Sequence, residues 1–191
     1  MSSAAILFDT EFTTWEGAMA SNWAEPWQHR ELVQVAAMKI DTQTLEEIER
    51  FNVVVKPQKN PEVSKYFVDL TGITNEFVNE NGVSFEEMHA KFEYFVKDAK
   101  AWSFGNDGGV FEENYDLYDL GQLQGRIDFQ NLHRFFQQQG VDVKAINSGK
   151  LASYFGLDIE IHEHNAMDDV RSIHAALTHL KAQGQGTPFI A

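Results

Sequence analysis

The chain has 191 residues, of which 43% are hydrophobic and 13% aromatic, so its composition is that of a globular protein and excludes intrinsic disorder. It has no cysteine, which excludes disulfides and thiolate metal sites, and no apolar run approaches the length of a membrane span. The net charge of −14 argues against an extended basic surface for long nucleic-acid duplexes, but not against an enzyme that grips a few nucleotides at an end.

These properties predict a single domain spanning residues 1–191, with a core at about residues 5–183 and a short tail at 184–191. The apolar run at residues 4–8 is too short for the core of a signal peptide and lacks a basic flank. A cytoplasmic location is therefore expected.

The chain opens with this apolar run, which is typical of a buried strand and ends in Asp9 and Glu11. Side chains two residues apart on a strand point to the same face. Two buried carboxylates would repel each other and be costly to desolvate, and a hard cation such as Mg²⁺ would resolve that conflict. Asp-x-Glu alone also fits a solvated strand end, so a metal site requires further ligands along the chain.

Residues 15–30 contain three tryptophans without clear periodicity and are expected to form an inserted loop. Residues 31–40 and 48–56 are β-branched runs separated by a polar turn, a pattern that predicts an antiparallel hairpin. Pro57 and Pro61 exclude a strand in the segment that follows.

Residues 71–75 are turn-like and could start a short helix. Ser84 begins a capping-box sequence, and apolar side chains follow it at helical spacing, which predicts a longer helix. A short strand is expected at residues 101–104, ending in a Gly-Asn-Asp-Gly-Gly turn, and another at residues 126–128.

Three helices are predicted in the remaining part. The first carries Leu132, Phe135 and Phe136 and ends at Gly140. The second is capped by Ser148 and closed by Gly156, and the third is capped by Asn165 and ends near Gly184. A hairpin followed by strands interleaved with helices predicts an α/β fold with a mixed sheet covered by helices.

Further carboxylates lie at the ends of the later elements. Asp107 follows a predicted strand, where α/β sheets place ligands, although an ordinary turn also explains it. Asp168 and Asp169 fall in the first turn of the last helix, where carboxylates complement the helix dipole. Capping explains Asp168, whereas Asp169 shares a face with apolar residues and should point inward, where it needs a partner.

Two histidines precede the last helix. His164 lies in the loop before it, at a defined spacing from Asp169. His162 and His164 together also form a His-x-His pair, which is a second, weaker candidate for a metal site.

Residues 8–13, 105–107 and 164–169 resemble, in order and spacing, the three motifs of the DEDDh family of 3′→5′ exonucleases. Residues 14–16, 31–34 and 70–74 look like the branch of the enhanced-RNAi exoribonucleases and their bacterial relatives. The similarity extends from residue 5 to about residue 180. The loop at 16–30 is long for the family and the stretch between the second and third motifs is short, and both flank the expected substrate groove.

The resemblance implies a ribonuclease H-like mixed sheet flanked by helices and a hydrolase that uses two divalent cations, Mg²⁺ or Mn²⁺. It implies that Asp9 bridges both ions, that Glu11 and Asp169 complete one site, and that Asp107 holds the other. His164, with an ordinary pKa near 6.5, would take the proton from the attacking water.

The family resemblance also implies a substrate and a mode of binding. The expected substrates are 3′ ends of single-stranded RNA or DNA, with RNA favoured, and the expected products are nucleoside 5′-monophosphates. Thr10 would contact the terminal nucleotide through its backbone and Phe12 by packing on the base or sugar, and Trp15 could extend that platform. A nuclease-like module that binds without cleaving, or a metal-dependent hydrolase of dinucleotides or small phosphoesters, are the alternatives.

Overall fold

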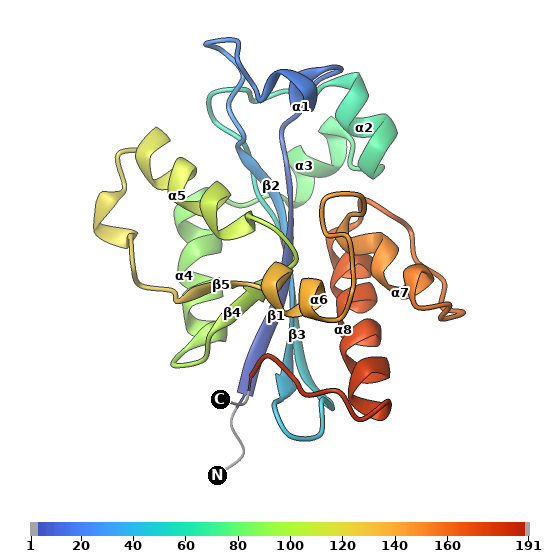
Figure 1. The fold of residues 1–191 in the computed structure, drawn as a ribbon. Coiled ribbons are helices and arrows are strands. Elements are labelled where there is room, and N and C mark those ends of the chain that lie inside the picture. The colour runs from blue at the N-terminus through green and yellow to red at the C-terminus, as the bar shows by residue number, and fades with distance from the viewer. Residues whose placement is uncertain (1–3, 190–191) are drawn as a thin grey trace.

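The computed structural model describes residues 4–189, so residues 1–3 and 190–191 of the predicted domain lie outside it. A five-stranded sheet with the order β3-β2-β1-β4-β5 runs through its centre (Figure 1). β2 is antiparallel to both β1 and β3, whereas β4 is parallel to β1 and β5 to β4. The predicted mixed sheet is confirmed, with these bounds: β1 Ala4–Phe12, β2 Leu32–Asp41, β3 Glu47–Val54, β4 Ala101–Ser103 and β5 Phe129–Asn131.

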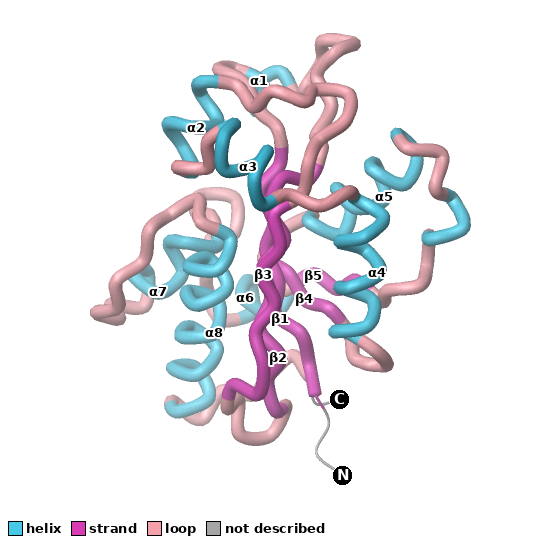
Figure 2. Tube along the Cα trace, turned by 180° about the vertical axis from the view of Figure 1, so that it is seen from behind, coloured by secondary structure: helices cyan, strands magenta, loops and turns pink. Residues whose placement is uncertain are grey.

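Helices cover both faces of the sheet, and a group of short ones lies beyond the end of β1 (Figures 1 and 2). None of the helices in the described part of the chain is long and apolar enough to cross a membrane. The helices are α1 Ala18–Ser21, α2 Lys65–Thr71, α3 Asn75–Asn81, α4 Phe85–Val96, α5 Asp107–Leu117, α6 His133–Gln138, α7 Leu151–Tyr154 and α8 Ala166–Ala182, with 3-10 turns η1 Gly121–Leu123 and η2 Ser148–Lys150.

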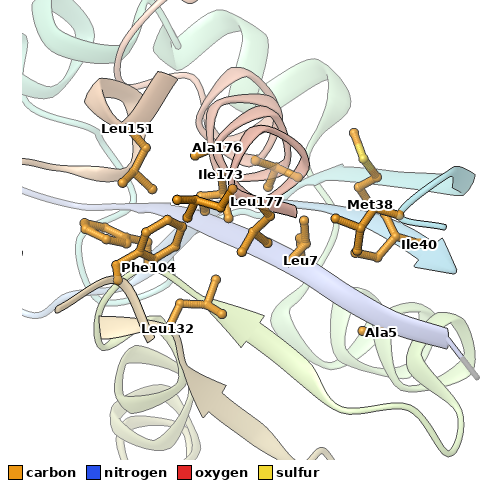
Figure 3. Close-up of a cluster of buried hydrophobic side chains, with 14 of the residues drawn as sticks. Ala5, Leu7, Met38, Ile40, Phe104, Leu132, Leu151, Ile173, Ala176 and Leu177 are labelled. Atoms are coloured by element: carbon orange, nitrogen blue, oxygen red, sulfur yellow. The ribbon is translucent and has the colours of Figure 1, made fainter. Parts of the chain in front are cut away.

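The central strand β1 contributes to two hydrophobic cores. Ala5 and Leu7 pack against the α8 side, as Figure 3 shows, whereas Ile6 and Phe8 pack against the α4 and α5 side. The Phe8 ring lies 5.9 Å from that of Phe92, centroid to centroid. Because neighbouring strand residues alternate between faces, Asp9 and Glu11 continue the face of Ala5 and Leu7. The sequence of β1 therefore directs both carboxylates toward the α8 side.

Several predicted elements are confirmed together with their caps. β2 and β3 form the expected hairpin. Ser84 caps α4, since its Oγ accepts a hydrogen bond from Glu87 N at 3.2 Å, and Thr74 caps α3 in the region expected to start a short helix. Asn165 caps α8, and its Oδ1 accepts from Met167 N at 3.2 Å. These features are local, so a short stretch of sequence determines them.

The second half of the sheet differs from the prediction. The strand expected at residues 126–128 is wrong, because β5 pairs Phe129 with Ala101 and begins at Phe129. The turn expected at 105–109 continues directly into α5, which starts at Asp107 despite its two glycines. A side chain at Gly108 would lie 2.7 Å from Phe129 Cβ, so contact with β5 requires glycine in this helical turn.

Two helices and one cap differ from the sequence-based assignment. α2 was not predicted, and the loop at 15–30 contains the short helix α1. Ser148 does not cap the helical segment that follows it, because Asn147 Oδ1 accepts the hydrogen bond from Lys150 N at 3.1 Å. The described part of the tail also packs back on the sheet, where the Phe189 ring lies 5.5 Å from Trp102.

Candidate active site

Three buried carboxylates meet where β1 ends and α8 begins. Asp9, Glu11 and Asp169 each offer one oxygen, and these oxygens lie within 4.8 Å of one another. Their residues are between 4% and 8% exposed. Asp169 points inward as predicted, because the first turn of α8 packs on the same face of the sheet that the two β1 carboxylates occupy.

Asp107 lies beside this group but outside the tight cluster of three. Its Oδ1 accepts hydrogen bonds from Thr10 Oγ1 at 2.7 Å and from Thr10 N at 3.2 Å. Both Thr10 donors therefore hold Asp107 in place. The substrate contact predicted for the Thr10 backbone stays a prediction.

A cavity of about 340 Å³ opens over the carboxylates. All four carboxylates line it, and so does His164, which is half-buried in a left-handed backbone conformation with φ of 64°. The remaining wall is mostly apolar and comes from segments far apart in the sequence: Phe12, Met19, Trp23, Phe67, Leu70, Phe104, Val110, Val143 and Ile146. The site thus combines an anionic floor with apolar walls.

Burial and mutual repulsion dominate the electrostatics of the floor. Burial, followed by the charges of neighbouring carboxylates, raises the pKa values of Asp9 and Glu11 well above their ordinary values. Burial also raises the pKa of Asp107, although the Thr10 hydrogen bonds oppose it, and raises the pKa of Asp169 to about 7. Burial lowers the pKa of His164, which favours its neutral form.

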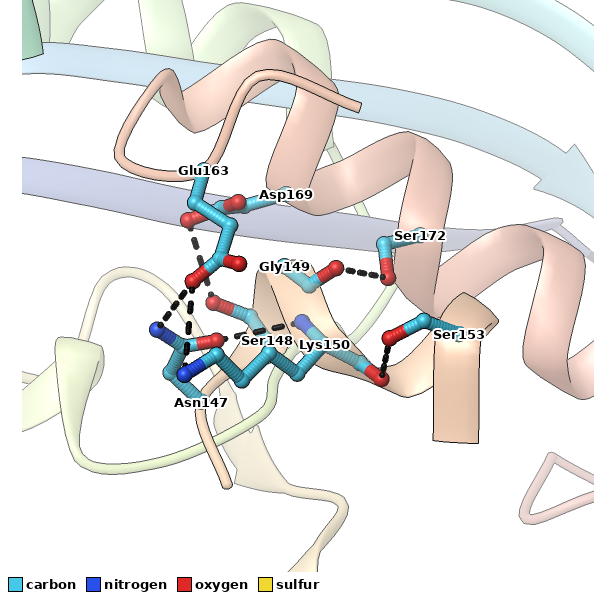
Figure 4. A network of polar contacts seen from close by, with 8 residues as sticks. All are labelled: Asn147, Ser148, Gly149, Lys150, Ser153, Glu163, Asp169 and Ser172. Atoms are coloured by element: carbon cyan, nitrogen blue, oxygen red, sulfur yellow. Dashed lines mark hydrogen bonds and ion pairs between the residues drawn. The ribbon is translucent and has the colours of Figure 1, made fainter. Parts of the chain in front are cut away.

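The arrangement around Asp169 fits a hard cation. Asp169 Oδ2 accepts a hydrogen bond from Ser148 Oγ at 3.3 Å, whereas the buried Oδ1 has no hydrogen-bond partner among the described residues (Figure 4). The backbone of Gly149 approaches Oδ1 so closely that a Cβ there would collide with it. An oxygen held in place but left unpaired, beside two more carboxylates, is a donor set suited to Mg²⁺ or Mn²⁺.

The turn at residues 147–150, which contacts Asp169, is itself held in place by hydrogen bonds to neighbouring segments. Ser172 Oγ donates to the Gly149 carbonyl at 3.0 Å and ties the turn to α8. Asn147 Nδ2 donates to Glu163 Oε2 at 3.3 Å, which connects the turn to the residue before His164 (Figure 4). Neither Ser148 nor Gly149 was predicted to be part of the site, because no spacing rule connects them to Asp169.

Replacing Gly149 with alanine is expected to weaken metal binding and hydrolysis because the new methyl group would displace the Asp169 carboxylate. We expect an affinity for Mn²⁺ lower by about 10–100-fold, the usual effect of disturbing residues that support metal ligands. Isothermal titration calorimetry with Mn²⁺ measures it. Gly121→Ala is the matched control, because a Cβ at Gly121 would contact nothing within 4 Å. Equal Mn²⁺ affinity in both variants would contradict the assignment.

Stability without metal is expected to fall as pH rises from about 4 through 7. The folded-state pKa of Asp169 is about 7, above the value near 3.9 of an unfolded aspartate, so the folded state binds the extra proton. That stabilisation is complete below pH 4 and is lost as pH rises through 7, and the raised pKa values of Asp9 and Glu11 act in the same direction. Urea unfolding at several pH values in EDTA measures it, and Mg²⁺ should flatten the profile. A flat profile in EDTA would contradict this prediction.

The cavity wall contains one of the two aromatic side chains that were predicted to contact the substrate. Phe12 lines the cavity and packs against Trp23, with ring centroids 5.7 Å apart. The Arg30 guanidinium lies 5.2 Å from the Trp23 ring centroid. Trp15 instead packs edge-on against Trp27 at 4.9 Å and is not among the residues lining this cavity. The sequence offered no periodicity in this loop by which to choose among its tryptophans.

Comparisons with known proteins identify the family and the fold. The family described as Exonuclease (RNase_T) matches residues 6–177. The nuclease domain of 3′hExo is 18% identical, with a TM-score of 0.73 over 100% of this chain and 97% of that one. E. coli Exonuclease I is 18% identical, with a TM-score of 0.67 over 94% of this chain and 41% of that one.

A full-length 3′-exonuclease is also 18% identical, with a TM-score of 0.72 over 97% of this chain, which spans 62% of its length. No curated protein matches the chain. At these identities the likeness shows the fold, and it confirms the predicted ribonuclease H-like architecture.

Proposed function

Because the chain belongs to the exonuclease family, we propose that it hydrolyses phosphodiester bonds from the 3′ end of single-stranded nucleic acid and releases nucleoside 5′-monophosphates. The observation that carries this proposal is the meeting of Asp9, Glu11 and Asp169, with Asp107 alongside, on the floor of one cavity. The proposal treats residues 1–191 as one exonuclease domain. A cytoplasmic location, expected from the sequence, remains part of it.

The four carboxylates would hold two divalent cations, Mg²⁺ or Mn²⁺. When bound, such ions supply Lewis acidity, which activates water and neutralises charge on the phosphate. Asp9 is central, since the charges of the other three carboxylates all raise its pKa, and this fits a residue shared between two ions. Thr10 would fix the Asp107 carboxylate, and Ser148 the Asp169 carboxylate, in the orientation that binding needs.

His164 is proposed as the general base that takes the proton from the attacking water. It lines the cavity next to the carboxylates, and burial keeps it neutral at physiological pH, so its ring can accept a proton. Phe12 on the apolar wall would pack on the terminal base or sugar. The contribution of Trp15 to that platform remains a proposal from the family resemblance.

RNA is the favoured substrate, by the resemblance to the enhanced-RNAi branch. Structural neighbours are known with both nucleic acids: 3′hExo is bound to rAMP, a 3′-exonuclease recognises the histone mRNA stem-loop, and E. coli Exonuclease I is in complex with a dA16 oligonucleotide. A cavity of about 340 Å³ accommodates a ligand the size of one nucleotide. The apolar wall stacks on any base, which supports sequence-independent trimming.

The same carboxylates and histidine bear on the two alternative functions. A module that binds without cleaving would be expected to lack a ligand or the base, whereas all four carboxylates and His164 line one cavity here. A hydrolase of dinucleotides or small phosphoesters is compatible with the carboxylate site, and substrate length is the property that distinguishes it.

The test is incubation of 3′- and 5′-end-labelled single-stranded RNA and DNA of equal sequence with Mg²⁺ or Mn²⁺. We expect stepwise shortening from the 3′ end and 5′-monophosphates as products, with RNA consumed faster than DNA. Dinucleotides and p-nitrophenyl phosphate serve as comparison substrates. If neither polymer is shortened while a control exonuclease is active in the same buffer, the proposed function is wrong.

A further inference from the structure

Gln34 is a buried polar residue of β2 that lies beside the candidate active site. It pairs with Glu11 across the β1–β2 ladder, so the two side chains stand next to each other on the face of the sheet that α8 covers. Gln34 is 5% exposed and is not among the residues that line the active-site cavity. It therefore neighbours a proposed metal ligand without facing the space that a substrate would occupy.

The side-chain amide of Gln34 joins three segments that are far apart in the sequence. Its Oε1 accepts a hydrogen bond from Ala166 N at 3.3 Å, and its Nε2 donates to Asn52 Oδ1 at 3.0 Å. Ala166 is the first residue of α8, and Asn52 lies on β3. The bond to Ala166 connects residues 132 positions apart, so it is a tertiary contact between the sheet and the start of the last helix.

The bond to Ala166 completes the N-terminus of α8. The first N–H groups of a helix have no partner within the helix and need acceptors from outside it. Asn165 Oδ1 accepts from Met167 N and Asp168 N, at 3.2 and 3.3 Å. Ala166 is 0% exposed, so its N–H has no access to water and depends on the Gln34 oxygen. Asn165 thus caps the helix locally, whereas Gln34 fixes its start on the sheet.

The start of α8 carries two of the proposed catalytic groups. His164 lies two residues before Ala166, and Asp169 lies three residues after it. Asp169 and Glu11 belong to the cluster whose ligand oxygens lie within 4.8 Å of one another, and Glu11 is the neighbour of Gln34 on the sheet. A misplacement of about 1 Å in such an arrangement can cost about 100-fold in rate. The position of α8 on β2 therefore controls the geometry of the cluster.

We propose that Gln34 is a positioning residue of the active site. Its hydrogen bond to Ala166 N holds the start of α8, and with it His164 and Asp169, in place relative to Glu11 on β1. Gln34 acts through these residues and contacts neither the substrate nor the cations. The inference rests on the proposed function for its effect on hydrolysis, whereas its effects on metal affinity and on the Ala166 N–H can be measured without hydrolysis.

The experiment compares two substitutions of Gln34. Gln34→Met removes both hydrogen bonds at similar size, whereas Gln34→Glu keeps an oxygen that can accept from Ala166 N. Calorimetry measures Mn²⁺ affinity, initial rates on the strand that the wild type shortens faster give kcat and KM, and amide hydrogen exchange followed by NMR measures protection of the Ala166 N–H. Ser84→Ala is the matched control, because it removes an N-terminal hydrogen bond from α4, which packs on the opposite face of the sheet.

Gln34→Met should lower Mn²⁺ affinity by about tenfold and kcat by about 10–100-fold, with KM changed by less than about threefold. Its Ala166 N–H should exchange at least about tenfold faster, whereas Gln34→Glu should stay within about threefold of the wild type in all of these measurements. Ser84→Ala should lower the Tm but leave Mn²⁺ affinity and kcat unchanged. Unchanged Mn²⁺ affinity in Gln34→Met, or an equal loss in Gln34→Glu or Ser84→Ala, overturns the inference.

Gln34→Asn replaces Gln34→Met if the latter misfolds by circular dichroism, because its amide is one methylene shorter and does not reach Ala166 N. If the wild type shortens no strand with Mg²⁺ or Mn²⁺, the proposed function fails, whereas Mn²⁺ affinity and the exchange of the Ala166 N–H still decide the role of Gln34.

Discussion

Replacing Asp9 with asparagine is expected to lower hydrolysis by at least about 1000-fold, because metal ligation contributes several kcal/mol to transition-state stabilisation. Asp9 is 6% exposed, and its pKa is raised by burial and then by Asp107, Asp169 and Glu11. The asparagine side chain has nearly the same shape as the aspartate side chain but carries no charge. Initial rates on end-labelled RNA measure the loss.

The same substitution should stabilise the metal-free protein, because it removes one charge from a group of buried, mutually repelling carboxylates. A gain of 1 kcal/mol corresponds to about 2–4 °C in Tm for a chain of this size. Thermal unfolding in EDTA and in excess Mn²⁺ measures both states. The wild type should gain more Tm from Mn²⁺ than the Asp9→Asn variant does.

Asp116→Asn, an exposed acidic residue on α5, is the control and should change neither rate nor Mn²⁺ response. An active Asp9→Asn protein would place the catalytic site elsewhere. An inactive variant that is also less stable in EDTA would instead mean that Asp9 supports the fold.

Replacing Glu31 with alanine is expected to destabilise the fold by about 3–4 kcal/mol, a fall in Tm of roughly 10 °C. Glu31 is 0% exposed, and its carboxylate accepts hydrogen bonds from three consecutive backbone N–H groups at residues 58–60, at 2.6 to 2.7 Å. Tyr118 Oη donates to the same carboxylate at 2.6 Å. Truncation would leave these donors without their acceptor, which is costly in a buried site.

Urea unfolding followed by tryptophan fluorescence measures the change. Glu31→Gln should lose less stability, since one carbonyl oxygen remains to accept, although its NH₂ group would face a backbone donor. Glu62→Ala is the exposed control and should change the free energy of unfolding by less than about 0.5 kcal/mol. Equal stability of Glu31→Ala and Glu62→Ala would show that the network contributes little.

Local periodicity and capping predicted several parts of this molecule correctly. The two-residue period of β1 placed Asp9 and Glu11 on one face, and the helical period of α8 turned Asp169 inward. Ser84 and Asn165 marked the starts of α4 and α8. Each of these features depends on residues within about one turn of helix or a few positions of strand, so the sequence contains all the information that they need.

Features that depend on distant segments were missed or misplaced. β5 begins at Phe129 because of its pairing with β4. Helix α5 tolerates its glycines because Gly108 packs on Phe129. The hydroxyl of Ser148 donates a hydrogen bond to Asp169 and does not cap a helix N-terminus. No local pattern reports these contacts, because the partners lie 20 or more residues apart in the chain.

The sequence alone predicted the kind of chemistry, through four carboxylates and a histidine whose order and spacing resemble the motifs of a family of metal-dependent hydrolases. The tertiary structure alone decided which side chains surround them. It put Trp23 and Arg30 into the cavity wall and Trp15 outside its lining, because the loop at 15–30 has no repeating pattern and takes its conformation from packing. Which residues carry the carboxylates can be read directly from the sequence, whereas the shape of the cavity arises only when distant segments pack together.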